Sequence, residues 1–200
     1  MKDKLYLMKN GDANVVKIGR AGDVEARQGQ FKTGNPEDMT VLDVVEADDA
    51  QPIETALHRL HYSKRLRGEF YGLTPAEAEE AGRQAREIRD VYLPMKLEVE
   101  RLAQTACDSP PLTATEEHRA LRRRVVEKRE AKYRAEFECD LAEFAYKAAM
   151  GTSEGIEGVG SWKTIVVQEF DRAAFREAHE DLYGAYVRPR PQRRFRVLWS

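Results

Sequence analysis

The sequence is poor in cysteine and contains no long hydrophobic run. Only Cys107 and Cys139 are present among 200 residues, and they form neither a CxxC pair nor a zinc-binding pattern. Two distant cysteines argue against a disulfide-stapled secreted fold and favour a reducing compartment. The N-terminal segment has no hydrophobic signal core, and no stretch approaches the ~20 apolar residues of a membrane span. We therefore expect a cytoplasmic protein that makes no contact with membranes.

An excess of charge of one sign is also absent. The 33 Lys and Arg residues nearly balance the 35 Asp and Glu residues, which leaves a formal net charge of -2. Global charge therefore gives no sign of nucleic-acid binding, and any contact with DNA has to come from local basic patches. Charged residues make up 34% of the chain and hydrophobic ones 42%, a balance typical of a small core joined to long solvated helices. The length allows one or two domains.

The first half of the chain alternates short strands with helices. Asn10-Gly11 predicts a hairpin turn between the first two strands, because both residues tolerate positive φ. Asp23 is a good N-cap for the first helix, and Thr74 with Glu77 forms a capping box for the third. The Thr-Gly-Asn-Pro segment at 33–36 ends the first helix. The expected strands are 5–8, 15–19 and 40–46, and the expected helices are 24–31, 49–62 and 75–92.

The second half is mainly helical. A helix from Pro94 to about Cys107 leads to a linker, and the 115–150 segment contains no proline or glycine, so we expect one long helix there. A glycine-rich loop over 151–160, a helix over 171–186 and an arginine-rich end follow. The domains we expect are 1–93, a helix and linker over 94–114, and 115–200. The apolar residues of the long helix form one stripe at spacings of four and three: Tyr133, Phe137, Leu141, Phe144 and Ala148.

Several polar residues of the first half stand at positions that suit chemistry. Tyr6 lies in the middle of the first strand, and Lys17 and Arg20 flank Ile18-Gly19 on the partner strand. Taken singly, each has an ordinary explanation as a core tyrosine or a solvated charge. The remaining candidates are Arg27 in the first helix, Glu69 in a short Arg-Gly-Glu-Phe-Tyr segment, and Glu54, His58 and His61, which share one helix face.

The order of these residues resembles a known family. The motifs Y-L-M, K-I-G-R, D-x-x-x-R, T-G-N-P, E-x-x-x-H and G-E-F-Y follow one another over residues 4–75. Together they resemble the GIY-YIG nuclease superfamily, in the branch found in phage reading frames and in a fungal meiotically up-regulated protein. The resemblance implies an α+β fold with a small three-stranded antiparallel sheet and flanking helices. It also implies hydrolysis of a DNA phosphodiester with one divalent metal ion, Mg²⁺ or another.

The same resemblance implies roles for individual residues. Tyr6 corresponds to the tyrosine of the first motif, a general base or its partner, and Arg27 to the helix arginine that contacts the phosphate. Glu54 corresponds to the acidic metal ligand. We add His58 to the catalytic set and Arg20 to the DNA contacts, with Gly19 and Glu69 as supports of the site. Two positions depart from the family pattern, because Lys4-Leu5-Tyr6 stands where GIY is expected and Lys17 stands where the second tyrosine is expected.

Elementary chemistry is consistent with these roles. The guanidinium of Arg27 offers a two-pronged hydrogen-bonding group for phosphate oxygens. One carboxylate suits Mg²⁺, which often keeps several waters. A phenol has a pKa of about 10, so Tyr6 needs a lowered pKa to act as a base, and the sequence suggests that Lys17 lowers it. His58 is alternatively a packing histidine, and a zinc site formed by Glu54, His58 and His61 is a further alternative.

The C-terminal segment carries a second resemblance. The string from Trp162 to Arg196 resembles the tail that follows the core of phage YqaJ-type recombination exonucleases, over residues 140–197. No catalytic residue is carried over from that family. Arg193, Arg194 and Arg196 around Phe195 suit a phosphate backbone and stacked bases, although a solvated basic terminus explains them as well.

These observations lead to three functional hypotheses. The first is a metal-dependent DNA endonuclease of phage or prophage type. The second is a non-catalytic nucleic-acid-binding module that keeps the fold. The third is a helical scaffold, in which residues 115–150 bind a second copy of the chain or a phage recombination partner.

Overall fold

The computed structural model describes residues 2–11, 13–31, 37–107, 109–188 and 193–197. The chain divides into two compact units, Met1–Leu102 and Ala103–Ser200, and each is described here by itself. The predicted turn at 33–36 lies outside the described residues, as does part of the arginine-rich end, 189–192. The expected α+β class is confirmed, with a helical C-terminal region after the sheet.

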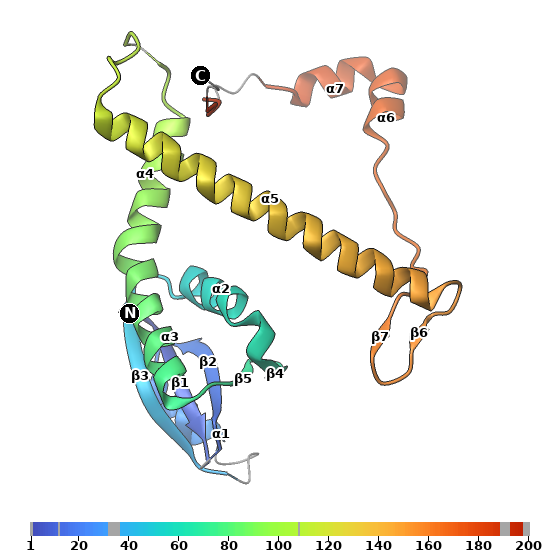
Figure 1. Ribbon diagram of the computed structural model, residues 1–200. Coiled ribbons are helices and arrows are strands. Elements are labelled where there is room, and N and C mark those ends of the chain that lie inside the picture. The colour runs from blue at the N-terminus through green and yellow to red at the C-terminus, as the bar shows by residue number, and fades with distance from the viewer. Residues whose placement is uncertain (1, 12, 32–36, 108, 189–192, 198–200) are drawn as a thin grey trace. The chain divides into compact units, whose positions relative to one another are not determined.

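The first unit is built on one antiparallel sheet (Figure 1). Every hydrogen-bonded pair of strands in it runs antiparallel, in the order β3-β1-β2-β5-β4. Strand β1 pairs with β2 on one side and with the edge strand β3 on the other, so the three predicted strands lie next to one another in the sheet. The strands are β1 (Asp3–Asn10), β2 (Val15–Ala21), β3 (Met39–Ala47), β4 (Arg65–Arg67) and β5 (Phe70–Gly72).

The sheet has five strands, so the prediction of three was wrong. The additional strands, β4 and β5, are three residues long each, which is too short for an alternating pattern to be recognised in the sequence. Gly68 makes the turn between them at φ +56°, and the Arg65 side chain donates a hydrogen bond to the Gly68 carbonyl at 2.5 Å. This turn carries Glu69 to the side of β2.

The first and third helices of the first unit begin where the sequence predicts, whereas the second, expected from residue 49, begins at Gln51 with Ala50 as its N-cap. The Asp23 carboxylate accepts a hydrogen bond from the Ala26 amide at 2.9 Å, and both bonds of the capping box of Thr74 and Glu77 are formed. The third helix passes through a π-helical turn, Ile88–Tyr92, and continues directly into the next helix. The helices are α1 (Val24–Phe31), α2 (Gln51–Leu60), α3 (Pro75–Glu87) and α4 (Leu93–Ala103).

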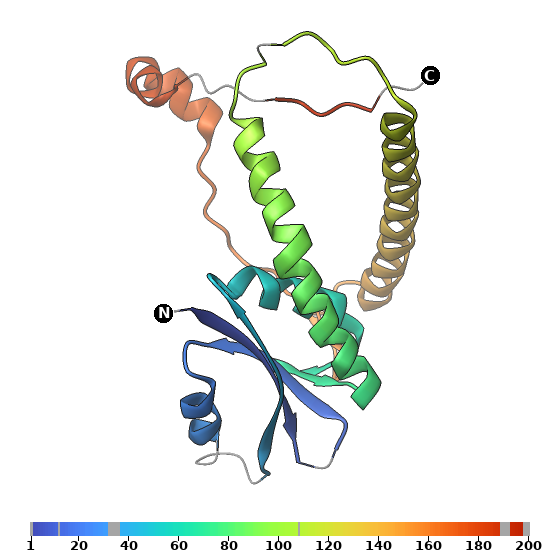
Figure 2. The same ribbon diagram turned by 90° about the vertical axis from the view of Figure 1, so that its left-hand side faces the viewer.

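Side chains alternate across β1 and create a core on each face of the sheet. Leu5 and Leu7 point to the face covered by α2 and α3, where they join the larger buried cluster. Tyr6 and Met8 point to the opposite face and pack with Val24 of α1. Figure 2 shows α1 on one side of the sheet and α3 on the other. The candidate residues of β1 and β2 therefore lie on two different faces, according to their place in the alternation.

The second unit contains the predicted long helix, α5 (Glu116–Met150), which begins with a capping box formed by Thr115 and His118. The 151–160 segment, expected to be a loop, includes a small hairpin, and the helix expected over 171–186 is interrupted at His179. No helix among the described residues is long and apolar enough to cross a membrane. The other elements are β6 (Gly155–Ile156), β7 (Gly160–Ser161), α6 (Arg172–Ala178) and α7 (Glu180–Tyr186).

Candidate functional site

The candidate residues of the first unit gather where the edge of β2 is left open. Along β2, only residues Val15–Lys17 pair with the short strand β5. One further hydrogen bond joins the Ile18 amide to the Glu69 carbonyl at 3.1 Å. In the described part of the chain, no strand pairs with this side of β2 beyond Ile18. Side chains from α1, α2 and the β4–β5 turn approach the edge instead.

Tyr6 and Gly19 are directly opposite each other on β1 and β2. The Tyr6 side chain is 1% exposed and lies across Gly19 so closely that a Cβ added at residue 19 would meet the phenol oxygen at 2.5 Å and Cζ at 2.7 Å. Real Cβ atoms do not approach other atoms to such distances. The absence of a side chain at residue 19 is therefore what allows the phenol to occupy this position.

Arg27 reaches the Tyr6 phenol from the first turn and a half of α1. Its guanidinium lies 4.8 Å from the centre of the Phe31 ring and donates to Gln30 Oε1 at 2.9 Å. It also forms a hydrogen bond with the Tyr6 side chain. The guanidinium is half-buried, stacked on one ring and held at its edge, so its direction is fixed before any ligand arrives.

Burial raises the pKa of Tyr6 above the ordinary phenol value of 10, although the hydrogen bond and charge of Arg27 act in the opposite direction. The Glu69 and Glu54 carboxylates raise the pKa of Tyr6 further, which places both carboxylates within electrostatic range of the phenol. The expectation that Lys17 lowers the pKa of Tyr6 was wrong. Lys17 is instead paired with another residue, and burial of the phenol outweighs the opposing effect of Arg27.

That partner is Glu69. The Lys17 ammonium is 6% exposed and lies 2.5 Å from Glu69 Oε2, with the Phe31 and Phe70 rings at 5.4 Å and 5.1 Å from Nζ. Burial tends to raise the pKa of Glu69, but the bond to Lys17, with the charges of Lys17, His58 and Arg27, holds it below its ordinary value of 4.5. Lys17 is therefore a buried cation with one carboxylate and two aromatic rings around it.

The two ends of this ion pair should respond differently to substitution. Glu69→Ala leaves a buried ammonium without its carboxylate and should lower the free energy of unfolding by about 2 kcal/mol. Lys17→Met should cost less, because Glu69 is 44% exposed and can be hydrated, while the Met side chain fills the space between the rings. Urea unfolding at neutral pH measures both. Equal losses would show that the buried charge is not the dominant factor.

The same pair predicts a dependence of stability on pH. Because the folded pKa of Glu69 lies below 4.5, its contribution is complete above pH 4.5 and is lost as the pH falls toward the folded value. The difference in unfolding free energy between the wild type and Glu69→Ala should therefore shrink in that acid range. A difference that stays constant from neutral to acid pH would contradict this assignment.

Glu54 approaches the same edge from α2. Its side chain is 15% exposed, and Oε2 lies 3.4 Å from Nε of Arg20, whose Nη1 is 3.3 Å from Asp3 Oδ2. Burial raises the pKa of Glu54 above its ordinary value of 4.5, and Glu69 raises it further, against the opposing charges of His58, Arg20 and Lys17. Glu54 is thus a partly desolvated carboxylate beside a second carboxylate, an arrangement that favours the arrival of a cation.

His58 follows Glu54 by one helical turn and closes the edge of β2. Its Nε2 is 3.2 Å from the Ile18 carbonyl oxygen, and its ring stacks on Tyr71 with centroids 5.4 Å apart. A carbonyl can only accept, so Nε2 of His58 is the donor in this contact. The Tyr71 hydroxyl is buried and has no hydrogen-bond partner among the described residues.

The zinc alternative is not supported by the geometry. His61 turns away from Glu54 and His58, and its Nε2 lies 3.0 Å from Gln84 Oε1 on α3. Among the described residues, no three His, Cys, Asp or Glu side chains are grouped so that they would hold a metal ion. A metal that needs only one protein carboxylate, with water and substrate oxygens as its other ligands, fits the donors at Glu54.

An open pocket of about 560 Å³ continues from Lys17 and Glu69 along the β4–β5 turn. Arg65 and Arg67 line it, and neither was among the residues we predicted from the sequence. The sequence did contain a signal for them. Arg65 and Arg67 are two residues apart just before Gly68, which places two cations on the same side of a turn. They give this end of the site a positive rim suited to a phosphate backbone.

The predicted tail arginines belong to the second unit. Arg193, Arg194 and Arg196 are exposed there, next to Phe195, whose ring lies 5.3 Å from the Arg129 guanidinium of α5. The site around Tyr6 is composed of residues of the first unit alone: Tyr6, Lys17, Gly19, Arg20, Arg27, Glu54, His58 and Glu69.

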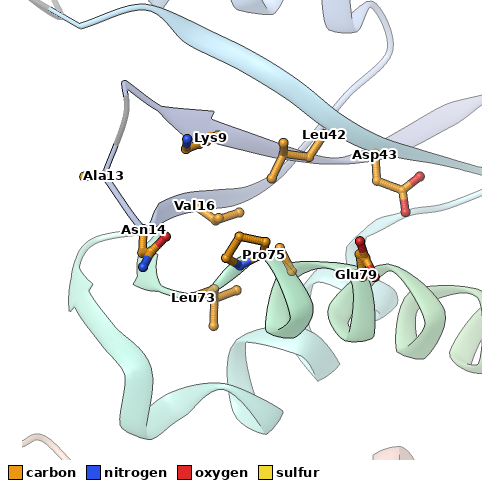
Figure 3. A pocket seen from close by; sticks show the side chains of 10 residues that line it. Lys9, Ala13, Asn14, Val16, Leu42, Asp43, Leu73, Pro75 and Glu79 are labelled. Atoms are coloured by element: carbon orange, nitrogen blue, oxygen red, sulfur yellow. The ribbon is translucent and has the colours of Figure 1, made fainter.

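A separate, more enclosed pocket of about 350 Å³ lies between the β1–β2 hairpin, β3 and the start of α3 (Figure 3). Figure 3 shows Lys9 and Asn14 toward one end and Asp43 and Glu79 toward the other, over an apolar floor. The Asp43 carboxylate is held by Arg86 at 2.6 Å and 2.8 Å. None of the predicted catalytic residues lines this pocket.

Comparison with known proteins relates the first unit to phage proteins. Residues 4–88 match the family model of the T5orf172 domain, a phage-associated domain found in GIY-YIG-like and HNH nuclease-related proteins. Neither a curated protein nor a solved structure matches the chain. The match ends at residue 88, and nothing supports the resemblance of residues 140–197 to a recombination exonuclease tail. Residues 4–88 are therefore similar to a phage-associated, nuclease-related domain.

Proposed function

We propose that the first unit is a phage-type DNA endonuclease that hydrolyses phosphodiester bonds with the help of one divalent metal ion, Mg²⁺ by preference. The observation that carries the proposal is the meeting of a fixed phenol–guanidinium pair, Tyr6 with Arg27, and a partly desolvated carboxylate, Glu54, at one open edge of the sheet. The match to a nuclease-related domain supports it.

In this proposal the cations neutralise the substrate before attack. Arg27 directs its guanidinium at two oxygens of the scissile phosphate, and Tyr6, kept neutral by burial, orients that guanidinium. Arg20 contacts the neighbouring phosphate. Arg65 and Arg67 bind the DNA backbone where it runs along the pocket. The Lys17–Glu69 pair stays in place as a support between the Phe31 and Phe70 rings.

The proton of the attacking water goes to His58. Because Nε2 of His58 donates to the Ile18 carbonyl, the proton is accepted at Nδ1 of the neutral imidazole, one helical turn from Glu54 on α2. Tyr6, with its raised pKa, is a poor base at neutral pH. Glu54 would hold the metal ion, which when bound polarises a phosphoryl oxygen and stabilises the leaving oxygen.

The proposal is tested by incubating the purified full chain with supercoiled plasmid in Mg²⁺ and, separately, in excess chelator. We expect nicking that requires the metal and that falls by about 10²-fold or more in Arg27→Ala, on the scale of losing one group that stabilises transition-state charge. Arg27→Lys should restore only part of the rate, because an ammonium keeps the charge and loses the two-pronged geometry. Cutting that is equally fast with chelator would contradict a metal-dependent reaction.

A non-catalytic binding module is the second candidate, and one observation favours it. Glu54 is already paired with Arg20, which is itself held by Asp3, so an arriving metal ion has to displace an existing partner. On this alternative the chain binds DNA through its arginines and never cuts it. Gel-shift measurements beside the nicking assay, with DNA and RNA substrates of equal length, separate the two candidates and decide the preferred nucleic acid.

A further inference from the structure

The long helix α5 presents an apolar face that the described residues cover only in part. Tyr133, Phe137, Leu141 and Phe144 recur at helical spacing on it and are 60%, 64%, 54% and 62% exposed. A row of large apolar side chains along one helix face indicates an interaction surface, because exposing such a row to water is unfavourable. The question is which partner covers it.

Charge is distributed unequally along the same helix. The 116–134 segment contains eight basic and four acidic residues, whereas the 135–150 segment contains four acidic residues and one basic residue. The first part is therefore net positive and the second net negative, with the change of sign near Ala135. A helix of this kind is complementary to a second copy of itself that runs in the opposite direction, and it repels a copy that runs parallel.

We propose that α5 pairs with α5 of a second copy of this chain in an antiparallel coiled coil centred near Ala135. In that register Tyr133 of one copy lies opposite Phe137 of the other, since each is two residues from the centre. Val126 lies opposite Phe144, each nine residues away. The two-fold axis produces each apolar contact twice, as in any isologous dimer.

The residues beside the stripe support the same register. At 3.6 residues per turn, Arg129, Lys132, Glu136 and Glu143 fall along one flank of the stripe, the basic pair before the centre and the acidic pair after it. Antiparallel pairing brings Glu136 of one copy near Lys132 of the other, and Glu143 near Arg129. Glu136 and Glu143 also form exposed pairs within their own helix, with Lys132 and Lys147, which are weak enough to be exchanged.

The tail of the chain is the competing occupant. Val197 lines a groove over Val126, Tyr133 and Phe137, and Phe195 stacks at Arg129. Within unit 2 this contact leaves Phe144 62% exposed and Leu141 54% exposed, so the described tail residues cover only part of the stripe. A second copy of α5 covers the whole of it.

Sedimentation of the full chain tests the association. We expect the wild type to sediment with twice the mass of one chain, and Phe137→Glu with Phe144→Glu to sediment as a monomer. A wild type that remains monomeric at tens of micromolar overturns the proposal. So does a monomer that begins to associate only after Phe195→Ala, because the tail would then be the natural cover.

Two mixing experiments test the direction of the helices. Glu136→Lys with Glu143→Lys makes the flank wholly basic, and Arg129→Glu with Lys132→Glu makes it wholly acidic, so each variant alone should be a monomer while the mixture forms a dimer. In a background of Cys107→Ser and Cys139→Ser, Val126→Cys should form a disulfide with Phe144→Cys of the other chain only when the two proteins are mixed. Disulfides within the Val126→Cys sample alone would show a parallel pair and overturn the antiparallel register.

Discussion

Replacing Glu54 by glutamine should reduce Mg²⁺-dependent cleavage by about 10²- to 10³-fold and, at the same time, make the protein more stable. The first effect follows from the proposed function, because the amide keeps the shape of the carboxylate and loses the charge that attracts the metal. The second follows from the pKa of Glu54, which burial and Glu69 raise above 4.5 in the folded state. A carboxyl group whose pKa is raised in the folded state opposes folding when it is ionised. Replacing it by a neutral amide should therefore increase the free energy of unfolding at neutral pH.

Glu87→Gln provides the matched control for this experiment. Glu87 is an exposed carboxylate of α3 outside the site, and its loss should change neither the cleavage rate nor the melting temperature. Single-turnover cleavage and thermal unfolding are measured on the same three preparations. A Glu54→Gln variant that keeps the wild-type rate would remove Glu54 from the proposed chemistry, and one that melts at a lower temperature would contradict the electrostatic account of the site.

Gly19→Ala should destabilise the first unit by about 1–3 kcal/mol and remove most of its cleavage activity. The new methyl group would lie 2.5 Å from the Tyr6 oxygen and 2.7 Å from Cζ, and one of the two has to move. The backbone of Tyr6 is held in β1 between β2 and β3, so we expect the ring to move and its contact with Arg27 to be disturbed. On the proposed function, the loss of activity would come from a changed direction of the Arg27 guanidinium, which the substitution does not itself contact.

The control is Gly29→Ala, in α1. A Cβ added at Gly29 meets nothing within 4 Å, and alanine is a better helix former than glycine, so this change should stabilise the unit by about 0.5–1 kcal/mol. Circular dichroism with urea gives both values. If Gly19→Ala proves as harmless as Gly29→Ala, the close approach of Tyr6 to the backbone is not a requirement of the fold.

The sequence allowed the elements with strong local signals to be predicted. The caps at Asp23 and Thr74 set helix starts that the structure confirms, because a capping residue and its partner are only three positions apart. Strands β4 and β5 were not predicted, because three residues are too few to show an alternating pattern. Their pairing with β2 depends on a turn at Gly68, and its geometry is decided by contacts far along the chain.

The candidate site was predictable in its members and less so in its electrostatics. Glu54 and His58 are one turn apart in a helix, so their common approach could be read from spacing. The contact between Lys17 and Glu69 joins residues separated by 52 positions, and no local pattern reveals it. The expected direction of the tyrosine's pKa shift was wrong because burial of the phenol, which the sequence does not reveal, raises its pKa more than the nearby cation Arg27 lowers it. Arg65 and Arg67 were missed together with strand β4, which carries both.

The open edge of β2 also bears on the solubility of the protein. Unpaired amide and carbonyl groups at a sheet edge are a template on which a strand of another molecule can add, which is a common first step of aggregation. Here the Ile18 amide is bonded to Glu69, its carbonyl is bonded to His58, and the charged side chain of Arg20 stands just beyond. The side chains proposed to act on DNA therefore also prevent a strand of another molecule from adding to this edge. An inactive His58 variant has to be checked for precipitation before its inactivity is attributed to the loss of a catalytic group.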